Sequence, residues 1–428
     1  MNKIIRSQAA VCLALVRETD RAVIADRQSA DQVLARVYRR HREYGARDRR
    51  FFSNAVFSWF RWRGWLETPD DRRVAAALLL DAAEIPPQAE YMAASSGRAG
   101  AGLKALGALS LEEKAAGLQA LLESGPRRIE QLAPDWLADF LFIPPDRDKE
   151  SWLRRCLEAF QSRPPVWIRL RRGGEDSALS RLVKAGYVTE CHPLLSQAVF
   201  IKGGKQFDAA LFPEIQVQDL ASQCAGLCCS PQPGEKWWDV CAGSGGKSLH
   251  LADLMRDCGQ ILATDVRPAI LEQLSRRLRR DRHPSIRPLS WDGSADPAPG
   301  TCFDGVLIDA PCSGLGTWAR NPDARWRMSA GQIADYAVIQ QNLLQIAAQK
   351  VKPGGRLVYA TCSLTEAENT GAVNAFLQRE KGFYMETTAN PLTRAPAGGL
   401  IWIWPWEGNC NGFFLAVMRR AGLCYPWW

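Results

Sequence analysis

The spacing of apolar residues changes along this chain of 428 residues. In residues 1–142 apolar side chains recur every three or four positions, as in ADQVLARVYRRHREYG and RRVAAALLLDAA, and loops rich in proline and glycine separate such segments. This period is that of an amphipathic α-helix. We therefore expect residues 1–142 to form an all-helical domain.

A shorter segment of mixed pattern follows. The helical period holds in WLRRCLEAFQSRP and EDSALSRLVKAG, whereas PVWIRLRR between them is apolar and extended. These patterns predict a small α+β module over residues 143–208.

From residue 209 to residue 428 short apolar runs alternate with helical segments. The strand candidates are KWWDVCA, QILATDV, SIRPLSW, FDGVLID and GRLVYAT, and the helical patterns between and after them include QIADYAVIQQNLLQIAAQKV and TEAENTGAVNAFLQRE. This alternation is typical of an α/β fold with a parallel, doubly wound, Rossmann-like sheet, whose ligands bind at the carboxyl ends of the strands. The last runs, LIWIWPW and GFFLAVMRR, can pair antiparallel at one edge.

No apolar run in the chain approaches the roughly 20 residues that cross a membrane. The apolar stretch AAVCLALV lies between Arg6 and Arg17 in a helical pattern; a signal peptide is the alternative, but the stretch has no convincing cleavage-site context. We expect a cytoplasmic protein with no membrane partner.

The 13 cysteines are odd in number and scattered, without CxxC pairs, and the chain has only 4 histidines. This usage indicates reduced thiols. The local cluster Cys224, Cys228 and Cys229 reads as buried helix residues, because free cysteine packs as a small apolar side chain. We expect no metal site.

The net charge of +8 is concentrated near the N-terminus. Residues 1–63 hold Lys3 and thirteen arginines against six acidic residues, so this segment alone carries a charge equal to that of the whole chain. In VYRRHREYGARDRRFFSNAVFSWFRWR arginines alternate with aromatic residues, a mixture that suits RNA phosphates and bases. The alternative is a solvated helix face with its aromatic side chains turned inward, and both can hold on opposite faces.

A glycine-rich stretch, DVCAGSGGKS (239–248), follows the first strand of the α/β region and opens a helix. A phosphate-binding loop requires glycine where Cys241 stands, and a dinucleotide fingerprint requires one where Ser248 stands. S-adenosylmethionine remains, because it needs only close approach of small backbone residues.

Two acidic residues end the next strands. Asp265 closes ILATDV and can accept both ribose hydroxyls of a cofactor, and Asp292 follows SIRPLSW and can bind the adenine amino group. Strand-end aspartates also occur simply in turns and as helix caps.

Two further strands run into cysteines: VLIDAPCSGLGTWARNP contains Asp309 and Cys312, and RLVYATCSLTEAEN contains Cys362. Cytosine C5 is a poor nucleophile, but a thiolate that adds at C6 turns the ring into an enamine whose C5 accepts a methyl group. An acidic group beside N3, such as Asp309, neutralises the charge that builds up. One such cysteine alone is most often a packing residue, and the residues themselves do not tell which thiol attacks.

These motifs resemble those of the RNA cytosine-5 methyltransferases, the family of bacterial ribosomal RNA methyltransferase B and the eukaryotic NSUN enzymes. The resemblance rests on DVCAGSGGKS, VLIDAPCSGLGTWARNPDARWR, RLVYATCSLTEAEN and GNCNGFFLAVMRR, and covers roughly residues 210–420. The module with PPVWIRL is similar to the family's accessory RNA-binding segment, and the arginine-rich helices resemble, more weakly, a NusB-type domain.

The resemblance implies a role for each residue of the site. Cys362 would be the nucleophile, Cys312 would assist product release, and Asp309 would contact the base and the cofactor. The implied cofactor site consists of Cys241, Ala242, Gly243, Ser244, Gly245, Gly246, Lys247, Asp265, Asp292 and Asp309. The chain departs from the family where AGSGG replaces the usual AAPGG, which loosens this loop, and where Asn411 replaces an aspartate.

The expected function is methylation of cytosine C5 in structured RNA, ribosomal RNA first and transfer RNA second, by a monomer that uses S-adenosylmethionine. A second hypothesis is an RNA-binding ribosome-assembly factor with weak or no methyl transfer, motivated by the altered glycine loop. A third is an N-methyltransferase on the same sheet, which would have no use for paired thiols.

Overall fold

The computed structural model describes residues 3–95, 104–202, 207–208, 211–212, 214–281 and 283–422. It divides into two compact units, one of Met1–Arg163 with Thr317–Ala330 and one of Pro164–Gly316 with Gly331–Trp428. The division into three domains at residues 142 and 208 stays a prediction, and residues 209–210 at its second boundary lie outside the described part.

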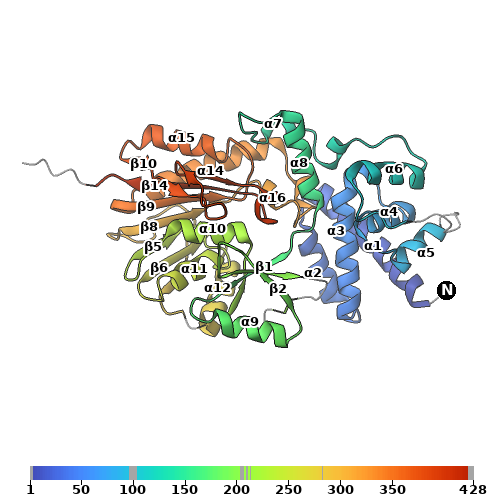
Figure 1. Ribbon diagram of the computed structural model, residues 1–428, viewed down its shortest axis with the longest axis horizontal. Helices are drawn as coiled ribbons and strands as arrows, with labels where there is room; N and C mark the ends of the chain where they lie inside the picture. The colour runs from blue at the N-terminus through green and yellow to red at the C-terminus, as the bar shows by residue number, and fades with distance from the viewer. Residues whose placement is uncertain are drawn as a thin grey trace, which may run out of the picture. The chain divides into compact units, whose positions relative to one another are not determined.

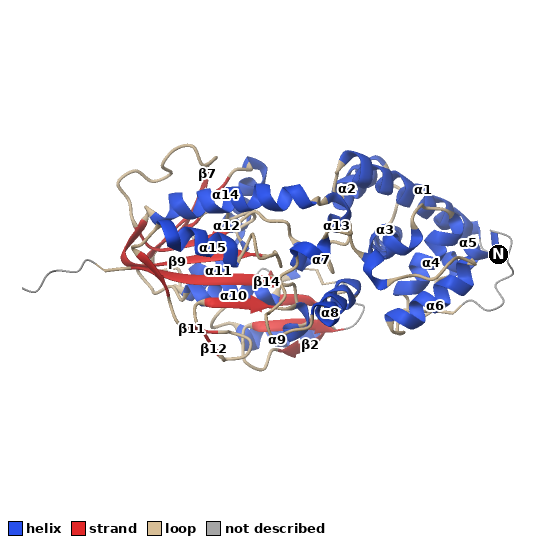
Figure 2. Cartoon of the chain, turned by 90° about the horizontal axis from the view of Figure 1, so that it is seen from above, coloured by secondary structure: helices blue, strands red, loops and turns tan. Residues whose placement is uncertain are grey.

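The first unit is built from helices (Figure 2). Its elements are α1 (Lys3–Asp26), α2 (Ala30–Arg40), α3 (Ala46–Leu66), α4 (Asp71–Asp81), α5 (Pro87–Ser95), α6 (Leu111–Leu122), η1 (Ile129–Leu132), α7 (Leu137–Phe140), α8 (Lys149–Gln161) and α13 (Ala324–Arg327). Capping boxes begin α2 and α6: Ser29 accepts from the backbone of Gln32, Ser110 accepts from the backbone of Glu113, and each partner side chain bonds back. The predicted helical N-terminal region is confirmed.

The aromatic residues and the arginines of the arginine-rich segment differ in burial. Its tryptophans Trp59, Trp62 and Trp65 are completely buried in the core of the helical unit. Exposed arginines on α2, on the turn after it and on α3 are Arg39, Arg40, Arg42, Arg47 and Arg50. The aromatic side chains therefore stabilise the helices, and the arginine side chains face solvent.

Residues 317–330 follow Cys312 in sequence but pack within the helical unit. Arg325 is fully buried and donates to the carbonyl oxygens of Leu132, Phe160 and Trp318. Burial, together with the charge of Arg61, lowers the pKa of Arg325 to about 9. This short segment is therefore an integral part of the helical core.

The second unit begins with a four-stranded antiparallel sheet in the order β2-β3-β1-β4. Its elements are β1 (Val166–Leu170), α9 (Glu175–Lys184), β2 (Val188–Cys191), β3 (Ala198–Lys202) and β4 (Ile215–Val217). Ile168, Leu170 and Val199 from this sheet pack with Leu182 of α9.

The larger sheet has the strand order β10-β14-β9-β8-β5-β6-β7, with β13 paired to β14. Strands β9, β8, β5, β6 and β7 are parallel, and β14 joins them antiparallel to β9. The elements are α10 (Leu220–Cys229), β5 (Lys236–Asp239), α11 (Gly246–Leu254), β6 (Gln260–Asp265), α12 (Pro268–Asp281), β7 (Ile286–Ser290), β8 (Phe303–Asp309), η3 (Leu315–Thr317), α14 (Ala330–Ala348), β9 (Val351–Thr361), α15 (Thr370–Arg379), β10 (Phe383–Met385), β13 (Leu400–Ile403), α16 (Pro405–Gly408) and β14 (Phe413–Arg420). A separate pair consists of β11 (Thr388–Ala389) and β12 (Pro396–Ala397).

Helices cover both faces of the larger sheet. In Figure 1, α14 and α15 lie on one side of the strands and α10, α11 and α12 on the other. Successive side chains of β5 pack on opposite faces of the sheet: Trp237 packs toward α11 and Trp238 toward α14. The predicted doubly wound, Rossmann-like sheet is confirmed, and so is the antiparallel pairing of the last two apolar runs.

Candidate active site

The strand order reverses between β5 and β8, and the carboxyl ends of these strands flank the switch point where ligands of such sheets bind. The glycine loop 240–245 lies between β5 and α11 at this edge. Gly243 and Gly245 have φ of 55° and 85°, and a Cβ on Gly245 would come within 2.2 Å of Leu274 of α12. The loop thus needs glycine both for its turn and for its close contact with α12.

Asp265 lies directly beside the glycine loop. Its carboxylate accepts a hydrogen bond from the backbone of Gly243 at 2.9 Å and two from the side chain of Arg267. Burial alone would raise the pKa of Asp265, but the hydrogen bonds and charge of Arg267 lower it overall. Asp265 is therefore an ionised acceptor at the rim of the loop.

Asp292 has a different environment. Its side chain is exposed and accepts from the backbone and the hydroxyl of Ser294, which lower the pKa of Asp292. Among the described residues no hydrogen bond joins Asp292 to the glycine loop. Its contacts are those of a local turn, and its role toward adenine stays a prediction.

Lys247, in the first turn of α11, forms an ion pair with Asp309 at the end of β8. The Nζ to Oδ2 distance is 2.6 Å, and the lysine side chain is 10% exposed. Burial would lower the pKa of Lys247, but the negative charge of Asp309 outweighs it and the pKa is raised. Asp309 thus lies next to a charged ammonium group, a pairing that the sequence motifs did not predict.

The two predicted thiols face each other. Cys312 Sγ and Cys362 Sγ are 3.4 Å apart, and both side chains are half-buried. The hydrogen bond to Cys362, followed by burial, raises the pKa of Cys312 well above its usual value. Cys312 is therefore held as a thiol, and either sulfur can donate the S–H hydrogen bond between them.

A buried carboxylate connects the loops that carry the two thiols. Glu368 is fully buried and accepts from the backbone of Ser313 at 2.7 Å and from the hydroxyl of Ser363 at 2.5 Å. Thr365 and Gln340 donate to the same carboxylate. Because Ser313 follows Cys312 and Ser363 follows Cys362, Glu368 fixes the separation of the two sulfur atoms.

The helix predicted from TEAENTGAVNAFLQRE begins only at Thr370. The residues before it bond to the thiol loops: Glu368 binds as described, and Asn369 accepts from Thr361 and donates to the carbonyl of Ser363. Sequence reasoning missed both as site residues, and the available signal was a carboxyl and an amide within seven residues of Cys362.

Asp239, at the end of β5, is a fully buried acid beside the site. Ser248 donates to its Oδ2, whereas its Oδ1 has no hydrogen-bond partner among the described residues. Burial, reinforced by the charge of Asp309 and only partly opposed by the hydrogen bond from Ser248, raises the pKa of Asp239 to about 7. The folded protein therefore binds a proton here that the unfolded chain releases near pH 4.

We expect Asp239→Asn to flatten the dependence of stability on pH. The pKa is higher in the folded state, so the free energy of unfolding falls as pH rises from about 4 to 7, by about 3 to 4 kcal/mol from this group. Denaturant unfolding at pH 5 and pH 8 measures the effect. In the exposed Asp335→Asn variant the free energy of unfolding should depend on pH as it does in the unaltered protein. The same dependence in Asp239→Asn would refute the raised pKa of Asp239.

The cysteines of α10 are not part of this site. Cys224, Cys228 and Cys229 are buried on α10, as predicted. In the described parts of the chain no three His, Cys, Asp or Glu residues are grouped as metal ligands. Within the same parts, none of the helices is both apolar and long enough to span a membrane.

Comparison with known proteins gives the family. The profile described as "16S rRNA methyltransferase RsmB/F" matches residues 227–419. The "Probable ribosomal RNA small subunit methyltransferase B" of Synechocystis is 33% identical over 307 residues, which are 67% of each chain. The "Ribosomal RNA small subunit methyltransferase B" of Xanthomonas campestris is 28% identical over 95% of this chain and 100% of its own.

A solved structure extends the likeness in fold. The crystal structure of the protein PH0851 has a TM-score of 0.71 with this chain at 24% identity, and the match covers 95% of this chain and 99% of the other. The glycine loop, the strand-end acids and the paired thiols all lie within the second unit, and all of them fall inside residues 227–419. The chain therefore belongs to the ribosomal RNA small subunit methyltransferase B family.

Proposed function

We propose that this protein transfers a methyl group from S-adenosylmethionine to C5 of a cytidine in ribosomal RNA, through a covalent bond between Cys362 and C6. The observation that carries the proposal is the pair of sulfur atoms 3.4 Å apart at the strand edge that also holds Lys247 and Asp309. An N-methyltransferase would need neither thiol.

The residues of the glycine loop fit the cofactor. S-adenosylmethionine supplies an electrophilic methyl group when bound. The close backbone of residues 241–246 suits a ligand without phosphates, and the ionised carboxylate of Asp265 can accept ribose hydroxyls. Asp292 is assigned to the adenine by its place after a strand and by the family resemblance.

Each side chain of the proposed mechanism has one task. The Cys362 sulfur forms a bond to C6, and the electron pair of the C5–C6 double bond moves to C5, which gains the methyl group. The ammonium of Lys247 stabilises the negative charge that builds up on the pyrimidine ring, and Asp309 hydrogen-bonds the edge of the ring. A base such as water then removes the C5 proton, the C5–C6 double bond re-forms, and the Cys362 sulfur leaves with the electron pair of the C6–S bond. The S–H group of Cys312, 3.4 Å away, can assist by donating a hydrogen bond to the departing sulfur.

The substrate RNA would be held by positive charge. The exposed arginines of α2 and α3 suit phosphate contacts, which position a nucleic acid without reading its sequence. The cytidine must leave its stack to reach the thiols. We propose a cytoplasmic monomer that acts on ribosomal RNA, and transfer RNA is the alternative substrate.

Bisulfite sequencing tests the proposal, because 5-methylcytosine resists conversion. RNA from cells with the gene should contain a resistant ribosomal cytosine that is absent from cells without it, and the purified protein with S-adenosylmethionine should restore it. Mass analysis of the modified nucleoside should place the methyl group on C5. A methyl group on a nitrogen, or an unchanged set of resistant cytosines, would refute the function.

A further inference from the structure

Helix α12 holds the glycine loop at two points one helical turn apart. Leu274, fully buried, lies against Gly245. Arg277 donates from Nη1 to the backbone carbonyl of Ser244 at 2.8 Å. The tip of the loop is therefore fixed by a side chain outside it.

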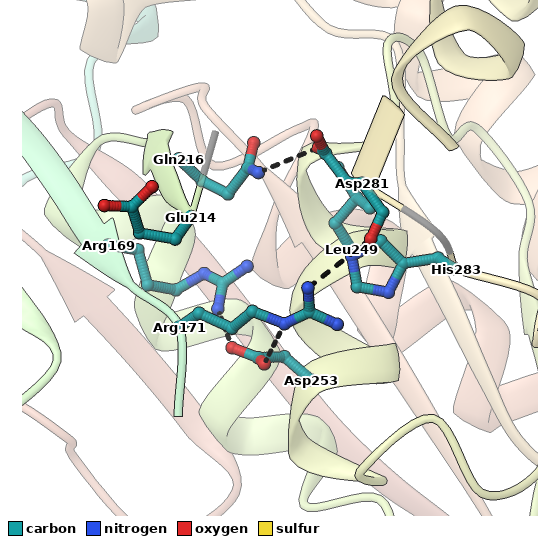
Figure 3. Close-up of a pocket in the computed structure, with 8 residues that line it drawn as sticks. All are labelled: Arg169, Arg171, Glu214, Gln216, Leu249, Asp253, Asp281 and His283. Atoms are coloured by element: carbon teal, nitrogen blue, oxygen red, sulfur yellow. Dashed lines mark hydrogen bonds and ion pairs between the residues drawn. The ribbon is translucent and has the colours of Figure 1, made fainter. Parts of the chain in front are cut away.

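The same guanidinium binds a second element. Its Nη2 donates to Oε1 of Gln216, which lies on β4 in the four-stranded sheet. Gln216 is buried, and its amide in turn donates to Asp281 at 3.2 Å (Figure 3). Arg277 is thus oriented by a side chain whose own position is fixed.

A second buried link strengthens this junction. Arg169 of β1 is buried and pairs with Asp253 of α11 at 2.5 Å, as Figure 3 shows. The space enclosed among these side chains is only about 10 Å³, about enough for a single water molecule. The junction is therefore a packed support for α11 and α12, the two helices that flank the loop, and not a ligand site.

The loop needs such support because its own sequence is permissive. Gly243 and Gly245 on either side of Ser244 both have positive φ, so the backbone has little intrinsic preference for the folded turn. The serine stands where the resembled family usually has proline, so the ring that would restrict φ is missing.

We propose that Arg277 is a positioning residue for the cofactor: it holds the Ser244 carbonyl, replaces the stiffness that proline would give, and so raises the affinity for S-adenosylmethionine. The inference rests on the proposed function and deepens it. Gln216 makes β4 of the small sheet part of this support.

Binding of S-adenosylhomocysteine to the full chain, measured by calorimetry, tests the proposal. Arg277→Ala should weaken binding about five- to tenfold, as loss of one charge-assisted hydrogen bond predicts. The matched control is Arg276→Ala, whose exposed side chain pairs only with Glu272 on the same helix among the described residues and which should bind normally.

Adding Ser244→Pro to the Arg277→Ala variant should recover most of the lost affinity for S-adenosylhomocysteine. Ser244 does not have positive φ, and its N–H donates no hydrogen bond among the described residues, so proline can be accommodated. In turnover assays Arg277→Ala should raise the KM for S-adenosylmethionine and leave kcat and the KM for RNA unchanged. Arg277→Lys, which reaches one acceptor but not both, should bind S-adenosylhomocysteine with intermediate affinity. This variant replaces Arg277→Ala in the test if the alanine variant does not fold.

Equal affinities of Arg277→Ala and the unaltered protein would overturn the inference, and so would a loss that Ser244→Pro does not recover at all. A failure of the unaltered protein to bind S-adenosylhomocysteine would instead overturn the proposed function. The two failures are therefore distinguishable.

Discussion

Replacing Cys312 by alanine should leave the protein covalently joined to its RNA, because the sulfur of Cys362 then adds to C6 but its expulsion is no longer assisted. Cys362→Ala should yield neither methylated product nor adduct, since no bond to C6 forms. Both outcomes follow from the roles that the family resemblance implies for the two thiols, whose sulfur atoms are 3.4 Å apart. Denaturing gels of protein incubated with labelled RNA and S-adenosylmethionine detect the adduct as a band of reduced mobility.

Cys302→Ala serves as the control, because this exposed thiol lies at the opposite end of β8 from Asp309. It should methylate RNA at the normal rate without accumulating adduct. An adduct with Cys362→Ala and none with Cys312→Ala would reverse the two roles. Full activity in both Cys312→Ala and Cys362→Ala would rule out covalent catalysis.

Asp309→Asn should reduce kcat by at least about 100-fold, because the pyrimidine would lose the acidic group that neutralises, at N3, the negative charge built up as the thiolate adds. The adduct should also fail to accumulate when this change is combined with Cys312→Ala. Single-turnover methylation of RNA at saturating cofactor measures the rate.

The substitution also leaves the ammonium of Lys247, which is only 10% exposed, without its counter-charge, and this lowers stability by up to about 3 kcal/mol. The double variant Asp309→Asn with Lys247→Met removes the unpaired charge and should regain thermal stability while activity stays lost. Activity that returns together with stability would show that Asp309 only maintains the fold.

The fold could be predicted well from the sequence because its periodicities are local. The alternation of strands such as QILATDV and FDGVLID with helices specified the parallel sheet, and the three- to four-residue period specified the helical N-terminal region. The packing of residues 317–330 among helices of the first unit could not be predicted, because the buried contacts of Arg325 join residues that are far apart in sequence.

The site was predictable where strands end in reactive side chains. Cys312 and Cys362 were expected at the ends of different strands, and their sulfur atoms do contact each other. Glu368 was missed because its partners are contributed by two loops and a helix, so no local pattern marks it. The partnership of Lys247 with Asp309 was missed for the same reason, since 62 residues separate them.

The insertion of residues 317–330 into the helical core has a consequence for how such proteins can evolve. A recombination event that exchanged the first 163 residues for those of another gene would also have to exchange residues 317–330. The reason is that Trp318 and Arg325 are fully buried and pack within the helical unit. The two segments must therefore be inherited as a matched pair, and substitutions in one should be accompanied by compensating changes in the other.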